Sequence, residues 1–119
     1  MEFYYHDVDH GVLVLSADGG LNADTADQFV AGVEKLLDAG VSRIIVDCQR
    51  LDYISSRGVG TLLTLHKRME QRGGDVRLAA ARGIVPQVIH TLGLDRVFQI
   101  YPDVERARLA FREPDGDKA

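Results

Sequence analysis

The clearest hydrophobic pattern in this sequence lies between residues 44 and 69, where an apolar run leads through a short polar stretch into helical spacing. Residues 44–46 are all β-branched and apolar, which is typical of a strand buried on both faces of a sheet. Ser55 and Ser56 precede the helical spacing. A serine in that place is a typical helix N-cap, because its hydroxyl accepts an unpaired N–H of the first turn. The pattern predicts strand, loop and helix, with two hydroxyls at the positive end of the helix dipole.

The helix that follows these serines is predicted over residues 56–71. Apolar residues at helical spacing are expected to face the core: Val59, Leu62, Leu63, Leu65 and Met69. Charged residues are expected to face solvent: Lys67, Arg68, Glu70 and Arg72. The pair Gly73 and Gly74 ends the helix.

The rest of the chain alternates between strand and helix patterns. Strands are predicted over residues 2–8, 11–16, 43–48, 75–81 and 97–101. Helices are predicted from an N-cap at Asn22 to a cap at Gly40, over residues 56–71 and 84–92, and after Pro102.

The order of these elements, ββαβαβαβα, predicts an α/β fold with helices packed on a mostly parallel central sheet. A turn at residues 9–11 predicts an N-terminal antiparallel hairpin, and residues 18–20 are expected to end its second strand.

Composition narrows the class of protein. The 119 residues are enough for one domain with a real core. The net charge of −4 and the scattered basic residues argue against nucleic-acid binding, which needs clustered Lys and Arg. The single cysteine, Cys48, favours a reducing compartment. The N-terminus lacks a signal-peptide pattern, and no apolar run reaches the roughly 20 residues of a membrane span. We therefore expect a soluble, cytoplasmic protein.

The sequence contains no strong pattern for a catalytic, metal or cofactor site. The histidines are scattered and none pairs with Cys48 at ligand spacing, so no metal site is predicted. The Gly58-x-Gly60 pair is a weak dinucleotide pattern because Leu63 stands where a third glycine is needed, and we predict no cofactor. Ser55 and Ser56 lack a G-x-S-x-G context and an evident base, so a nucleotide-binding or hydrolytic enzyme is only a remote alternative.

The residues alone favour a simple interpretation of the two serines and of Cys48. One serine caps the helix and the other faces solvent, while Cys48 is a small core residue at the end of a buried strand. Asp47 is either a solvated carboxylate at the strand end or a brace that accepts backbone N–H groups of the following loop.

Three segments in register along nearly the whole chain resemble one family. Residues 45–60 contain I-V-D and L-D-Y-I-S-S-R-G-V-G, residues 20–26 read G-L-N-A-D-T-A, and residues 92–98 read L-G-L-D-R-V-F. Together they resemble the signature of STAS domains, the anti-sigma factor antagonists and their relatives. The resemblance implies a single STAS domain over residues 1–112, followed by a polar tail over residues 113–119.

The resemblance also implies a function in transcription regulation by partner switching, without enzyme activity. In bacterial antagonists of this type, the dephosphorylated domain binds a kinase-type anti-sigma factor and thereby releases the sigma factor. The kinase phosphorylates a hydroxyl in the loop before the second helix, and a phosphatase reverses this. The implied partner-binding residues are Asn22, Asp24, Thr25, Tyr53, Ser55, Ser56, Arg57, Gly58 and Val59.

The chain departs from the family pattern at the phosphorylation site. The usual order is an acidic residue, a hydroxyl residue and then the phosphorylated Ser or Thr directly before the glycine. Here these positions hold Ser55, Ser56 and Arg57, so Ser56 is the first candidate for phosphorylation and Ser55 the second. Alternatively, Arg57 marks a non-switching interaction subunit, such as a signalling scaffold or the cytoplasmic subunit of a lipid ABC transporter. The same helix and its loop could equally form the interface of a homodimer.

Overall fold

The computed structural model describes residues 2–7 and 11–112 of the chain. Its sheet has the order β1 (Glu2–Asp7), β2 (Val12–Leu21), β3 (Arg43–Asp47), β5 (Asp75–Ala79) and β6 (Ile100–Tyr101). Strands β2, β3, β5 and β6 run parallel, and β1 pairs antiparallel with β2. The turn predicted between the first two strands falls mostly on residues 8–10, outside the described residues. The predicted α/β fold with a mostly parallel sheet is confirmed.

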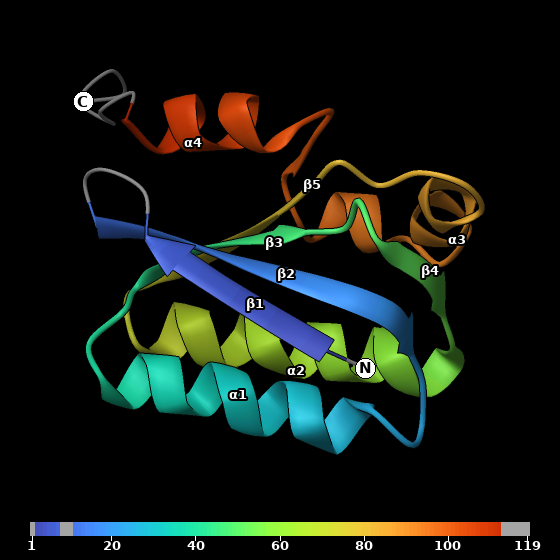
Figure 1. The fold of residues 1–119 in the computed structure, drawn as a ribbon, viewed down its shortest axis with the longest axis horizontal. Coiled ribbons are helices and arrows are strands. Elements are labelled where there is room, and N and C mark those ends of the chain that lie inside the picture. The colour runs from blue at the N-terminus through green and yellow to red at the C-terminus, as the bar shows by residue number, and fades with distance from the viewer. Residues whose placement is uncertain (1, 8–10, 113–119) are drawn as a thin grey trace.

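Helices cover both faces of the sheet (Figure 1). The helices α1 (Ala26–Asp38) and α2 (Ser56–Gln71) lie on one face, and α4 (Val104–Arg112) lies on the other. The short helix α3 (Val85–Thr91) and the 3₁₀ turn η2 (Leu94–Arg96) complete the main core together with α1 and α2.

Two apolar clusters follow from the alternation of side chains along the strands. On β3, Ile44 and Val46 face the main core, whereas Ile45 faces a smaller cluster with Ala107 and Phe111 of α4. All three β3 residues are buried, so the prediction of a strand covered on both faces is confirmed.

Helices α1 and α2 are joined along their length by charged pairs. Acidic residues on α1 face arginines of α2 or its C-cap in the pairs Asp27–Arg57, Glu34–Arg68 and Asp38–Arg72. Arg72 also donates a hydrogen bond of 3.0 Å to the carbonyl of Leu37 in the last turn of α1. The Leu37 carbonyl also accepts the N–H of Gly40 at 3.0 Å, so the arginine adds a second donor and ties the C-cap of α2 to the end of α1. The predicted glycine cap is confirmed as well, since Gly40 has φ +93° directly after the C-cap.

The structure corrects the predicted end of the second strand. A further strand, β4 (Leu51–Ile54), pairs in parallel with the last residues of β2. Strand β2 therefore continues to Leu21 through the predicted break, with an irregularity between Gly19 and Gly20. Sequence reasoning took residues 51–54 for loop, because only Leu51 and Ile54 of this short strand are buried and the two residues between them are exposed.

The predictions for the C-terminal third were partly wrong. The strand predicted over residues 97–101 is only Ile100–Tyr101, because η2 occupies residues 94–96 and Val97 is its C-cap. The strand predicted over 75–81 ends at Ala79, since Ala80 adopts φ +63° and cannot continue an extended strand. No helix in the described part of the chain is long and apolar enough to cross a membrane.

Candidate functional site

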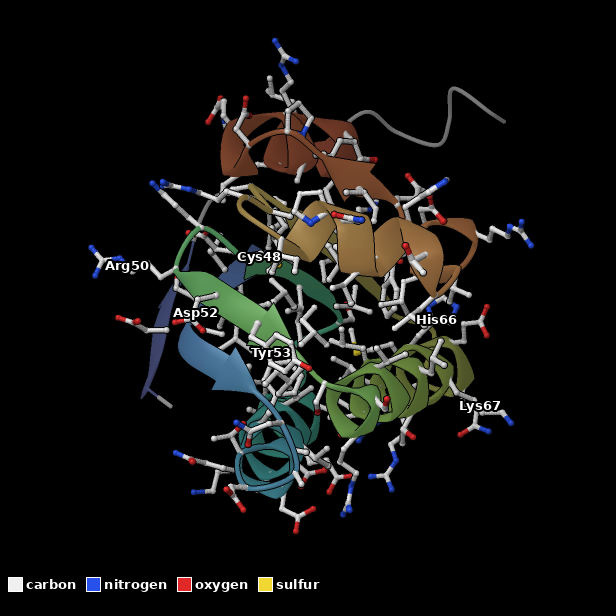
Figure 2. The ribbon with its side chains drawn as sticks, turned by 90° about the vertical axis from the view of Figure 1, so that its right-hand side faces the viewer. Cys48, Arg50, Asp52, Tyr53, His66 and Lys67 are labelled. Atoms are coloured by element: carbon white, nitrogen blue, oxygen red, sulfur yellow. The ribbon has the colours of Figure 1, made fainter. Side chains whose placement is uncertain are left out.

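The residues expected to bind a partner come together at one end of the sheet. The Ser55 N–H donates a hydrogen bond of 2.9 Å to the carbonyl of Leu21, which joins the start of α2 to the end of β2. In the same strand pair, Gly20 lies opposite Tyr53. The loop over residues 22–25 leaves directly from this end of β2. Both segments of the predicted surface are therefore adjacent, and Figure 2 shows Tyr53 on β4 at this end of the molecule.

The two serines have different roles. Ser55 is the N-cap of α2, with extended backbone and a hydroxyl that accepts the Gly58 N–H at 3.1 Å. Ser56 is the first residue of the helix and its side chain is exposed. The interpretation that one serine caps the helix while the other faces solvent is confirmed. The free hydroxyl at the positive end of the helix belongs to Ser56.

Replacing Ser55 with alanine should lower the free energy of unfolding by about 1 kcal/mol, because the Gly58 N–H would lose its acceptor. The matched control is Ser56→Ala, which removes an exposed hydroxyl and should change stability by less than about 0.5 kcal/mol. Urea unfolding followed by circular dichroism measures both. Equal losses in the two variants would contradict the assignment of Ser55 as the cap.

Gly58 fixes how closely α2 approaches the sheet. A β-carbon at this position would lie 2.4 Å from the carbonyl oxygen of Leu21 and 3.1 Å from Cγ2 of Ile54. Real β-carbons do not approach backbone oxygens this closely, so only glycine fits here. Gly60 has open space around the same position. Close packing thus accounts for the first glycine of the weak dinucleotide pattern and leaves the second unconstrained.

Arg57, which stands at the family's phosphorylation position, is largely exposed. Its Nη2 lies 3.9 Å from Oδ1 of Asp27 on α1, and the side chains of the two residues are 61% and 91% exposed. Pairs this exposed contribute little to stability. Both charged side chains are therefore accessible to a binding partner.

The loop between β2 and α1 is ordered by its own side chains. Helix α1 is assigned from Ala26, and Thr25 directly before it makes no side-chain capping bond. Asn22 makes the contacts predicted for a cap, because its side-chain oxygen accepts the N–H groups of Asp24 and Thr25, at 2.8 and 3.1 Å, and its carbonyl accepts the N–H of Ala26 at 2.8 Å. The predicted capping role of Asn22 is therefore confirmed, one turn before the assigned start of α1. The Thr25 hydroxyl donates to the carbonyl of Gly20 at 2.7 Å. Asp24 is exposed on the surface of this loop.

The helix face of α2 was partly mispredicted. Leu62, Leu65 and Met69 are buried as expected, and Val59 is partly buried. Leu63, however, is 40% exposed and was wrongly assigned to the core. The sequence did contain a signal for this exposure. Leu63 stands four residues after the partly buried Val59, so both residues lie at the edge of the apolar stripe and not at its centre.

The opposite face of the sheet carries a polar cavity of about 370 Å³, lined by Ser16, Asp47, Gln49 and Arg50. The Asp47 carboxylate accepts the Gln49 N–H at 3.0 Å and the Ser16 hydroxyl at 3.2 Å. Asp47 therefore braces the loop after β3, which was one of the two interpretations that the sequence left open.

The described residues hold neither a reactive thiol nor a cluster of metal-ligating side chains. Cys48 is buried, and burial raises the pKa of its thiol to about 12, which keeps the thiol protonated at neutral pH. No group of three or more His, Cys, Asp or Glu side chains within the described residues could hold a metal ion.

Comparison with known proteins places the chain in a family. Residues 6–107 of the chain match the family model of the STAS domain. The chain belongs to the STAS domain family. It is 31% identical over 102 residues to BtrV of Bordetella bronchiseptica, which is named as an anti-sigma factor antagonist; the match covers 86% of this chain and 88% of BtrV.

Solved structures agree with this assignment. A protein of Thermotoga maritima described as an anti-sigma factor antagonist superimposes with a TM-score of 0.87 and 27% identity, over 93% of this chain and 95% of that one. An anti-sigma factor antagonist from Mycobacterium paratuberculosis gives a TM-score of 0.84 and 25% identity, over 94% of each chain.

Proposed function

We propose that this protein is an anti-sigma factor antagonist that regulates transcription by partner switching in the bacterial cytoplasm, as a binding protein and not as an enzyme. Membership of the STAS family and the names of its relatives support this proposal. The observation that carries it is the exposed Ser56 hydroxyl at the N-terminus of α2, next to an ordered loop that presents Asp24. The proposed partner is an anti-sigma factor of the serine kinase type.

The proposed contact surface combines the loop after β2 with the start of α2. From the loop it includes Asn22, Asp24 and Thr25, and from β4 and α2 it includes Tyr53, Ser55, Ser56, Arg57, Gly58 and Val59. Within it, Ser55 and Gly58 act by holding the geometry, since one caps the helix and the other allows its close approach to β2. The exposed side chains of Tyr53, Ser56 and Arg57 make the contacts with the partner.

Phosphorylation of Ser56 is the proposed switch. The Ser55 hydroxyl is already engaged with the Gly58 N–H, and arginine at position 57 cannot accept phosphate from a serine kinase. A phosphate on Ser56 adds a charge of about −1.5 to −2. The helix N-terminus tolerates that charge. A partner surface shaped around a neutral hydroxyl does not tolerate it, so binding is lost until a phosphatase removes the group.

Replacing Ser56 with glutamate should therefore weaken binding to the kinase-type anti-sigma factor at least about tenfold without unfolding the protein. The matched control is Ser56→Ala, which should bind like the wild type. Isothermal titration of each variant with the purified kinase-type anti-sigma factors of the source organism measures the affinity. Mass spectrometry after incubation with the kinase and ATP should locate phosphate on Ser56.

Two outcomes would change this proposal. Equal binding of wild type and Ser56→Glu, with no phosphate found, would show a docking module without a switch, as the arginine at position 57 allows. Absence of stable binding to every such anti-sigma factor would refute the proposed function.

A further inference from the structure

Thr25 stands directly before α1, yet its hydroxyl bonds to the strand behind it and not to the helix that follows. The hydroxyl donates a hydrogen bond of 2.7 Å to the carbonyl of Gly20 and accepts the Asn22 N–H at 2.9 Å. A threonine in this place usually accepts an N–H of the first helical turn, and Thr25 makes no such bond. Its side chain therefore has a role other than capping, and both of its partners lie at the end of β2 or directly after it.

The polar side-chain groups of Asn22 and Thr25 are used inside the loop. The Thr25 hydroxyl has a single hydrogen, and the Gly20 oxygen receives it because Asn22 Oδ1 is further away, at 3.4 Å. Asn22 Oδ1 instead accepts two backbone N–H groups of the loop. Thr25 and Asn22 are also partly buried, whereas Asp24 between them is exposed. Of these three side chains, that of Asp24 is the most accessible to a partner.

The end of β2 that Thr25 contacts also holds the start of α2. The carbonyl of Leu21, the next residue along the strand, accepts the Ser55 N–H at 2.9 Å. Two neighbouring carbonyls of β2 therefore fasten the two segments of the proposed contact surface: that of Gly20 holds the loop, and that of Leu21 holds the helix. A shift at this strand end would move both segments.

Side chains of the loop and of β4 meet over Gly20. A β-carbon built on Gly20 would lie within 4 Å of three atoms, namely Asn22 Nδ2 at 3.6 Å, Asp52 Oδ1 at 3.7 Å and Tyr53 Cβ at 3.9 Å. Figure 2 shows Asp52 and Tyr53 on β4, which pairs with this end of β2. The position of the loop is therefore set against the strand that leads into α2.

We propose that Thr25 is a positioning residue of the partner surface, and that its hydroxyl fixes the loop over residues 22–25 in the place that the anti-sigma factor recognises. This inference rests on the proposed function. It assigns Asn22 and Thr25 to holding the surface, and it leaves Asp24 as the loop's contact with the partner. Without the hydroxyl, the Gly20 carbonyl and the Asn22 N–H lose a partner, and the loop samples other positions. Binding must then order the loop, which lowers the affinity.

The first measurement uses the free protein. Thr25→Val removes the hydroxyl and keeps the branched shape, whereas Thr25→Ser keeps the hydroxyl. Hydrogen exchange of the Asn22 amide, followed by NMR, should be at least about tenfold faster in Thr25→Val and within about threefold of the wild type in Thr25→Ser. Val33→Ala truncates a buried residue of α1 and is the matched control for lost stability. It should leave this exchange within about threefold of the wild type, because loops open locally.

Two results of the exchange measurement would overturn the inference. One is equal exchange at Asn22 in the wild type and in Thr25→Val. The other needs no variant: an Asn22 amide that exchanges in the wild type as fast as a free peptide would mean that the Thr25 hydroxyl does not hold it.

The second measurement is the affinity for the anti-sigma factor that binds the wild type. Thr25→Val should weaken binding about tenfold, whereas Thr25→Ser should stay within about threefold and Val33→Ala within about twofold of the wild type. Asn22→Ala should weaken binding as well. The double variant Asn22→Ala/Thr25→Val should lose little more than the larger single loss, because both side chains act through one loop position. Losses that multiply would indicate two independent contacts with the partner and would overturn the inference.

The outcomes separate this inference from the proposed function. If Ser56→Glu loses binding while Thr25→Val binds like the wild type, the inference is wrong and the proposed function stands. If Val33→Ala loses as much affinity as Thr25→Val, the effect is general destabilisation and the inference is wrong. If no kinase-type anti-sigma factor binds the wild type, both fail. Thermal unfolding confirms that each variant is folded.

Discussion

Alanine at position 58 should destabilise the protein by about 3 kcal/mol, the upper end of the range for overpacking. The added β-carbon would lie 2.4 Å from the Leu21 carbonyl oxygen, which belongs to a sheet strand and cannot move aside as a flexible side chain could. Relief would require α2 to shift away from β2. That shift would also disturb the 2.9 Å hydrogen bond from the Ser55 N–H to the Leu21 carbonyl, so partner binding should weaken as well.

Alanine at position 60 is the matched control, two residues further along the same helix. Nothing lies within 4 Å of the added β-carbon there. Because alanine favours the helix over glycine, Gly60→Ala should stabilise the protein by about 0.5–1 kcal/mol. Urea unfolding of both variants measures the difference. A Gly58→Ala protein as stable as the wild type would show that α2 does not approach β2 as closely as described.

Truncation of Leu62 to alanine should cost about 2–5 kcal/mol, the usual range for a buried leucine. The Leu62 side chain is 2% exposed and packs in the main core between α2 and the sheet. Its neighbours there include Phe29 of α1, which is also fully buried. The truncation would leave a cavity between these closely packed side chains.

Leu63→Ala is the matched control for this truncation. Leu63 is 40% exposed, so its removal should change the free energy of unfolding by less than about 1 kcal/mol. Equal losses of stability at both positions would mean that the buried side of α2 has been placed wrongly.

The sequence predicted α2 well because several signals agreed there. A serine cap, an apolar stripe and a glycine pair all pointed to residues 56–71, which are the observed bounds. The error at Leu63 arose because adjacent leucines both fit an apolar stripe, whereas only one of two neighbours can point at the sheet. The choice between Leu62 and Leu63 depends on how the helix is rotated, and tertiary packing sets that rotation.

Elements defined by distant contacts could not be predicted. Strand β4 exists because the end of β2 extends beyond β3 and offers it a partner, which no local pattern reveals. Val97 belongs to a β-branched and aromatic run typical of strands, yet it caps η2. For the site, the roles of the two serines and the capping contacts of Asn22 could be inferred locally, because each hydrogen bond joins residues two or three positions apart. The adjacency of the two segments could not be inferred, because it depends on the pairing of β2 with β4.

The contact between the Leu21 carbonyl and the start of α2 makes the proposed surface a discontinuous epitope. Residues 22–25 and 53–59 are separated in sequence by a whole helix and a strand, and only the β2–β4 pairing brings them together. A linear copy of α2 would carry Ser56 without the loop that lies beside it. A partner that contacts both segments therefore recognises only the folded chain, and an unfolded copy would not bind it.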